Sequence, residues 1–104
     1  MAYHGQLKIT SQKFTLELTD VNSTEHNKLA GDVRRVLENV YKDVYGKQFV
    51  NITNILFSNG SVLADYEVQL TDTSSDAEVQ TVLANYVNAQ NGKLGVLTVI
   101  VSSS

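Results

Sequence analysis

The chain has 104 residues, 42% of them hydrophobic, with no Cys and no Pro, and this length predicts one domain over residues 1–104. The net charge of −3 argues against a nucleic-acid partner, which needs clustered Lys and Arg. The lack of Cys excludes thiolate metal sites and cysteine nucleophiles. No apolar run approaches the roughly 20 residues of a membrane-spanning helix, so we expect no direct membrane insertion.

Two stretches near the start alternate with the period of a β-strand, residues 5–10 (GQLKIT) and residues 13–18 (KFTLEL). Periodicity alone does not choose between them as the first strand. From Asn22 onward, apolar residues recur at steps of three and four, which predicts an amphipathic helix that includes Leu29, Val33, Val36, Leu37, Val40 and Val44. Ser23 or Thr24 can cap its start, and Gly46 can end it.

A β-hairpin is predicted in the middle of the chain. Residues 49–57 (FVNITNILF) are rich in β-branched residues and indicate a strand. Asn59-Gly60 then forms a two-residue turn signal, because both positions tolerate positive φ. Residues 62–70 alternate apolar and mostly polar side chains, as expected for a strand with one buried face.

The C-terminal third predicts a polar loop, a second helix and a last strand. The loop covers residues 71–76, the helix carries Val79, Leu83 and Val87 on one face, and the strand covers residues 94–101. The order β-α-β-β-α-β predicts an α+β, ferredoxin-like fold. In it, a four-stranded antiparallel sheet carries two helices on one face.

The stretch LFSNGSVLADYEVQL, residues 56–70, resembles the hairpin of SEA domains, in which an apolar strand and a turn precede Gly-Ser-Val and more apolar strand. The resemblance covers about residues 6–101, the expected core of the domain. Further matches are LKIT at residues 7–10, Phe14, Leu18, Ser23, Tyr41 and Tyr45. The resemblance favours GQLKIT as the first strand. It makes residues 12–22 a connection that packs Phe14 and Leu18.

The resemblance implies an extracellular, juxtamembrane module of a larger protein. SEA domains occur in membrane mucins, adhesion-type receptors, proteoglycans and membrane-anchored serine proteases. Many cleave themselves between the Gly and the Ser and remain a non-covalent heterodimer. Here the cleaved bond is Gly60–Ser61, and the partner of residues 1–60 is the chain's own fragment 61–104. We expect no cofactor and no metal, because the chain lacks Cys and its two histidines, His4 and His26, offer no metal constellation.

The expected reaction is an N-to-O acyl shift, in which the Ser61 hydroxyl attacks the carbonyl carbon of Gly60 and water hydrolyses the resulting ester. A Ser hydroxyl is a poor nucleophile without help, and neither His4 nor His26 lies near the site in the sequence. We therefore expect folding to twist this peptide, and Gly60 has no Cβ to block the approach.

Four residues beside the Gly60–Ser61 bond support or disfavour a strained turn. Val62 fits the β-branched residues that follow the Ser in members that cleave, whereas Leu63 and Ala64 depart from that pattern. Asn59 precedes the Gly, and Asn-Gly is comfortable in an unstrained type I′ turn. The alternative is an intact hairpin. The domain is then a non-cleaving spacer or adhesion module that presents glycans near the membrane.

Three N-glycosylation sequons begin at Asn22, Asn51 and Asn59. In an extracellular family, Asn22 and Asn51 are reasonable glycan sites, and the competing role of Asn22 is a helix cap. The Asn59 sequon uses the same Ser61 that cleavage would use. Glycans and cell-surface proteins are therefore the expected partners besides the chain's own fragment.

Two enzymatic or binding alternatives share the same order of elements. An RNA-binding domain needs exposed aromatic residues on its central strands, and residues 61–70 offer only Tyr66. A small acyl-phosphate hydrolase would need an Arg in an anion-binding first turn, and residues 10–13 (TSQK) contain none. We therefore expect no enzyme beyond a single turnover on the chain itself.

Overall fold

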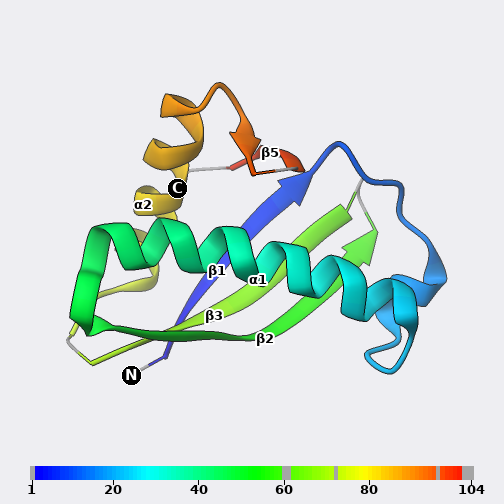
Figure 1. The fold of residues 1–104 in the computed structure, drawn as a ribbon, viewed down its shortest axis with the longest axis horizontal. Helices are drawn as coiled ribbons and strands as arrows, with labels where there is room; N and C mark the ends of the chain where they lie inside the picture. Colours follow the sequence, from blue (N-terminus) through cyan, green and yellow to red (C-terminus); the bar gives the residue numbers. More distant parts are fainter. Residues whose placement is uncertain (1, 60–61, 72, 96, 102–104) are drawn as a thin grey trace.

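The structure is a computed structural model that describes residues 2–59, 62–71, 73–95 and 97–101. Within these residues one antiparallel sheet has the strand order β2-β3-β1-β5-β4 (Figure 1). The α+β architecture is as predicted, with five strands in place of four. The elements are β1 (Ala2–Ile9), α1 (Thr24–Tyr45), β2 (Phe49–Asn59), β3 (Val62–Leu70), α2 (Asp76–Ala89), β4 (Lys93–Leu94) and β5 (Leu97–Ile100).

The extra strand arises because the predicted last strand, residues 94–101, is divided. Gly95 has a φ of +62°, a value that glycine tolerates and other residues rarely adopt. β4 and β5 therefore pair with each other, Lys93 opposite Thr98 and Leu94 opposite Leu97. β5 alone joins the main sheet, where it pairs with β1 at Lys8 and Ile9.

The start of the chain follows the prediction. β1 is the first strand, although it begins at Ala2, earlier than the predicted residues 5–10. The alternative stretch, residues 13–18, leads into a 3₁₀ turn at Leu16–Thr19 instead of a strand. Leu18 is buried in the core and Phe14 is half-buried against it, so this connection closes one end of the domain.

Both helices begin and end at residues that the sequence makes suitable. The Ser23 side chain caps α1 by accepting a hydrogen bond from the backbone N–H of His26 at 3.1 Å. α1 ends at Gly46, where φ is +59°. Ser75 caps α2 in the same way, accepting from the N–H of Glu78 at 3.0 Å.

The core lies between the sheet and the helices, which cover one face of it (Figure 1). β3 lies between β1 and β2 and pairs with both along its length. Its alternate residues face the helices and are buried, which confirms the predicted alternation: Val62, Ala64, Tyr66, Val68 and Leu70.

Gly5 allows the largest of these side chains to fit. It lies on β1 directly opposite Tyr66, and a Cβ at Gly5 would clash with the Tyr66 ring. Because both residues are buried, the ring has little room to move away. Gly5 therefore permits the close approach that places the Tyr66 hydroxyl in the core.

We expect Gly5→Ala to lower the free energy of unfolding by about 1–3 kcal/mol, because the new methyl group overpacks the Tyr66 ring. Gly31→Ala is the matched control. Gly31 lies in α1, and a Cβ there meets nothing within 4 Å. This control should stabilise the domain by about 0.5–1 kcal/mol. Urea unfolding measures both variants, and equal effects would contradict the packing argument.

Candidate functional site: the hairpin between β2 and β3

The hairpin is paired up to its last described residues. Ser58 lies opposite Leu63, and Asn59 lies opposite Val62. Gly60 and Ser61, the predicted cleavage residues, lie outside the described residues. The connection between the last paired residues therefore has two members, and the Gly60–Ser61 bond joins them.

This register corrects the predicted turn. Asn59 was expected to be a turn residue with positive φ, but it is the last residue of β2. Among the described residues, the non-glycine residues with positive φ are Asn54 and Asn91. Asn59 therefore belongs to the strand, because the pairing with β3 continues through it.

Val62 anchors the second strand immediately after the connection. Its side chain is fully buried, and its backbone pairs with Asn59 of β2 on one side and with Ile9 of β1 on the other. Phe57, also buried, fixes the end of β2 from the same face. The predicted role of Val62 as turn support stays a prediction.

A β-bulge in β2 sets the register of the hairpin. Thr53 pairs with Glu67 and Leu56 with Asp65, so β2 has one extra residue between them. Asn54 occupies this bulge with a φ of +54°, and its side-chain amide donates a hydrogen bond to Glu67 at 3.0 Å. The bulge lets Ile52 and Ile55 both face the core, although they are three residues apart.

His26 lies closer to the hairpin than its sequence position suggests. Its ring is buried and meets the Phe57 ring edge-on, with 5.2 Å between the ring centroids. Its Nδ1 lies 2.9 Å from the Leu18 carbonyl oxygen. This contact joins the start of α1 to the 3₁₀ turn, so the side chain holds three segments together beside the end of β2.

Two buried tyrosines are hydrogen-bonded to each other, one from the part of the chain before the Gly60–Ser61 bond and one from the part after it. The Tyr41 hydroxyl of α1 donates to the Val79 carbonyl of α2 at 2.9 Å. Because that proton is used, the Tyr66 hydroxyl of β3 donates to the Tyr41 oxygen at 2.7 Å. Burial raises the pKa of both tyrosines far above the usual value near 10. Sequence periodicity placed Tyr66 in the core but gave no sign of this bond.

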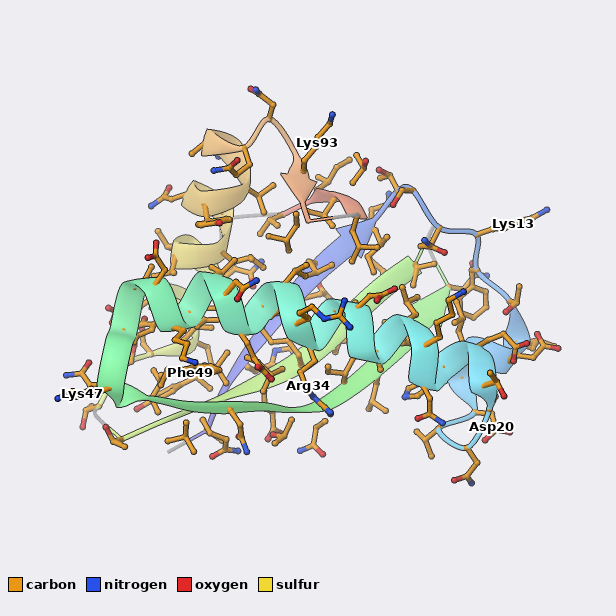
Figure 2. The ribbon with its side chains drawn as sticks, in the orientation of Figure 1. Lys13, Asp20, Arg34, Lys47, Phe49 and Lys93 are labelled. Carbon is orange, nitrogen blue, oxygen red and sulfur yellow. The ribbon has the colours of Figure 1, made fainter. Side chains whose placement is uncertain are left out.

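The placement of Tyr66 bears on the RNA-binding alternative. Its side chain points into the core, so it is not available on the open face of the sheet to stack a base. The outer positions of β3 are instead occupied by Leu63, Asp65, Glu67 and Gln69. Lys13, Lys47 and Lys93 project at separate corners of the molecule (Figure 2).

The three sequon asparagines, Asn22, Asn51 and Asn59, are exposed. Asn22 does not cap α1, because Ser23 does, and this corrects the alternative role considered for Asn22. The backbone N–H of Asn22 instead donates to Asp20 at 2.9 Å. Asn51 lies on β2, at the edge of the sheet.

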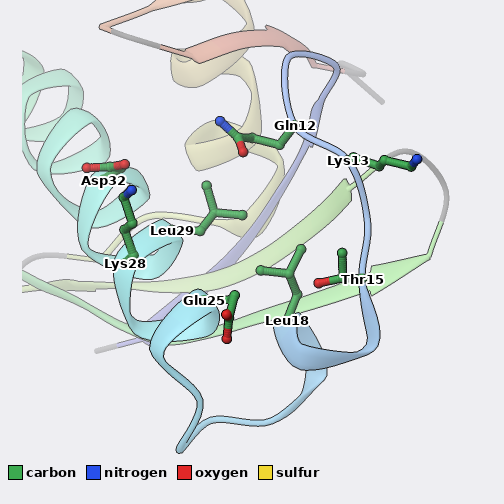
Figure 3. Close-up of a pocket in the computed structure, with 8 residues that line it drawn as sticks. All are labelled: Gln12, Lys13, Thr15, Leu18, Glu25, Lys28, Leu29 and Asp32. Atoms are coloured by element: carbon green, nitrogen blue, oxygen red, sulfur yellow. The ribbon is translucent and has the colours of Figure 1, made fainter.

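A cavity of about 250 Å³ lies between the connection after β1 and the start of α1 (Figure 3). Its charged lining is mixed, with Lys13 and Lys28 beside Glu25 and Asp32. The other lining residues are Gln12, Thr15, Leu18 and Leu29. The mixed charge of this lining favours neither an anionic nor a cationic ligand.

The described residues contain neither a metal-ligand cluster nor a helix that could span a membrane. No three His, Asp or Glu side chains in the described part of the chain come together as metal ligands would. Neither described helix is long and apolar enough to cross a bilayer.

The family model for the SEA domain matches residues 1–98, nearly the whole chain. No curated protein matches the sequence.

Proposed function

Because the chain belongs to the SEA domain family, whose members are extracellular modules, we propose that it is a self-cleaving joint of a larger membrane-associated glycoprotein. SEA domains are not a catalytic family, so the reaction is one turnover on the chain's own peptide bond. One observation carries the proposal: Gly60-Ser61 is the whole connection between two strands that pair as far as Asn59 and Val62.

The proposed chemistry uses only Ser61, Gly60 and water. The Ser61 Oγ attacks the Gly60 carbonyl carbon, the Gly60–Ser61 C–N bond breaks, and the hydroxyl proton ends on the released amine of Ser61. The product is an ester between the two residues. Water then hydrolyses it to give a carboxylate at Gly60 and restore the Ser61 hydroxyl. We expect the paired strands to hold the two groups together, which is the main help available to an unactivated hydroxyl.

The sheet supports continued association after cleavage. Fragment 61–104 contains β3, which lies between β1 and β2 of fragment 1–60. Separation therefore requires the loss of backbone pairing on both edges of β3. The bond between Tyr41 and Tyr66 also joins the two fragments in the core. Such a joint opens under load without breaking a covalent bond.

The exposed sequons and the family membership also support a proposal about where the domain is located and what it meets. Asn22 and Asn51 are accessible to glycosylation in an extracellular protein, and neither contributes to the hairpin connection. A glycan at Asn59 would compete with cleavage, because its sequon includes Ser61. We place the domain near the membrane, in a protein that meets glycans or other cell-surface proteins.

The second candidate function is a non-cleaving spacer or adhesion module with the same fold. The regular pairing of Asn59 with Val62 favours it, because Asn59 lies in a strand and not at positive φ. Leu63 and Ala64, which depart from the family pattern, follow directly in β3. This candidate predicts a chain that stays whole.

Hydroxylamine tests the proposed ester directly. Freshly folded protein treated with hydroxylamine should yield fragment 1–60 ending in a Gly60 hydroxamate, because hydroxylamine attacks esters faster than amides. Ser61→Ala should give no fragment that ends in a Gly60 hydroxamate, because its side chain has no hydroxyl. Hydroxylamine also cleaves Asn-Gly bonds, and mass separates the fragments cut at Asn59-Gly60 and Asn91-Gly92 from fragment 1–60. Ser61→Cys, which keeps a nucleophile, should still cleave. A fragment 1–60 without hydroxamate would contradict the ester route, and equal cleavage of Ser61→Ala between residues 60 and 61 would contradict any role for the hydroxyl.

A further inference from the structure

One edge of β1 is paired with a strand along its whole length, whereas a strand pairs with only a short part of the other edge. β3 pairs with it from Ala2 to Ile9. On the opposite edge, β5 pairs only with Lys8 and Ile9. In the described part of the chain, residues 2–7 have no strand beside them on that side. A free strand edge presents unpaired N–H and C=O groups to any other extended backbone.

Two side chains of α2 occupy this edge in place of a strand. The N–H of His4 donates to the Asp76 carboxylate at 2.9 Å. The N–H of Gln6 donates to the Gln80 side-chain oxygen at 2.9 Å, and the Gln80 amide nitrogen donates to the Gln6 carbonyl at 2.8 Å. The Gln80 amide thus makes the two bonds that a residue of an antiparallel strand makes to the residue opposite.

The backbone groups of His4 and Gln6 point to the same edge of β1 as those of Lys8, which β5 covers. His4, Gln6 and Lys8 are alternate residues of β1, and the last of them lies opposite Ile100 of β5. Hydrogen-bonding groups of alternate residues point to the same edge of a strand. The edge is therefore suited to strand addition wherever Asp76 and Gln80 are removed.

We propose that Asp76 and Gln80 close a strand-addition surface on β1, and that the partner which fits this surface is the same edge of a second copy. The two residues with outward groups, His4 and Gln6, flank Gly5. When two copies run antiparallel about Gly5, His4 of each lies opposite Gln6 of the other. Two-fold symmetry then repeats both pairs of bonds. This inference does not depend on cleavage at Gly60–Ser61.

The test compares the Asp76→Ala, Gln80→Leu double variant with the parent by sedimentation over a range of concentrations. All proteins carry Ser61→Ala, so that each is a single chain. The double variant should dimerise at least tenfold more tightly than the parent. Asn85→Ala, at an exposed position of α2, is the control and should behave as the parent does.

Amide hydrogen exchange locates the contact. The amides of His4 and Gln6 should be protected in the parent, fast in the dilute double variant, and protected again when that variant is concentrated. Adding His4→Pro to the double variant removes an edge N–H without removing a bond to β3, and it should abolish the dimer.

Three results would overturn the proposal: a folded double variant no more associated than the parent, a dimer with unprotected His4 and Gln6 amides, or a double variant that binds unrelated extended peptides but not itself. If the double variant does not fold, Gln80→Leu alone replaces it. That variant should show faster exchange at Gln6 and tighter self-association, and the absence of either would equally overturn the proposal.

Discussion

Tyr41→Phe should lower the free energy of unfolding by about 2–3 kcal/mol, whereas Tyr66→Phe should lower it by only about 1 kcal/mol, although each removes one hydroxyl. The Tyr41 hydroxyl both donates to Val79 and accepts from Tyr66. Its loss leaves the buried Tyr66 O–H without its acceptor. Loss of the Tyr66 hydroxyl removes one donor, and Tyr41 keeps its bond to Val79.

Chemical denaturation of both variants in the Ser61→Ala background measures this difference. The background keeps the chain whole, so that a single unfolding free energy is defined. The double variant Tyr41→Phe, Tyr66→Phe should cost less than the sum of the two single changes, because no donor is then left unpaired. Equal costs for the two single variants would contradict the assigned directions of the hydrogen bonds.

The domain should lose stability at alkaline pH, above about pH 10. Burial raises the pKa of Tyr41 and Tyr66 in the folded state, while the unfolded chain keeps values near 10. Above that pH the unfolded state loses protons that the folded state keeps. The stability these groups contribute is therefore complete below pH 10 and falls as the pH rises. The expected slope is about 1.4 kcal/mol per pH unit for each tyrosine.

Urea unfolding of the Ser61→Ala protein between pH 8 and about pH 11.5 measures this slope. In Tyr41→Phe the slope should be smaller, because one group whose pKa is raised by burial is gone while Tyr45 and Tyr66 remain. A stability that stays constant from pH 9 to 11 would contradict the burial of two neutral tyrosines.

Local patterns predicted much of the fold. The alternation of residues 62–70 assigned the buried face of β3 correctly, and the steps of three and four from Leu29 to Val44 located α1. Ser23 and Gly46 mark the ends of that helix because capping depends on residues close in the sequence. These features are visible because each arises from a few consecutive residues.

The features that the sequence did not reveal depend on pairing between distant segments. The bulge at Asn54 breaks the period of two in β2, and its position depends on the register with β3. The division of the last strand depends on Gly95, which lies so close to Val36 that a Cβ would be 2.6 Å from its Cγ1. The bonds from Gln80 to β1 join residues more than seventy positions apart.

Cleavage at Gly60–Ser61 stays a prediction, whereas the predicted turn position of Asn59 was wrong. An Asn-Gly pair is a strong turn signal, and it placed Asn59 in the turn. Pairing with Val62 instead keeps Asn59 in β2 and leaves Gly60 and Ser61 as the connection. The same pairing puts the predicted scissile bond in the middle of that connection.

The intact mass of the purified, denatured domain shows whether the chain cleaves itself. The proposal predicts two fragments, residues 1–60 and 61–104, whose masses sum to that of the chain plus one water. Ser61→Ala, prepared in the same way, should give one uncut mass. A single uncut chain in the parent after long incubation would contradict self-cleavage and favour the spacer or adhesion module.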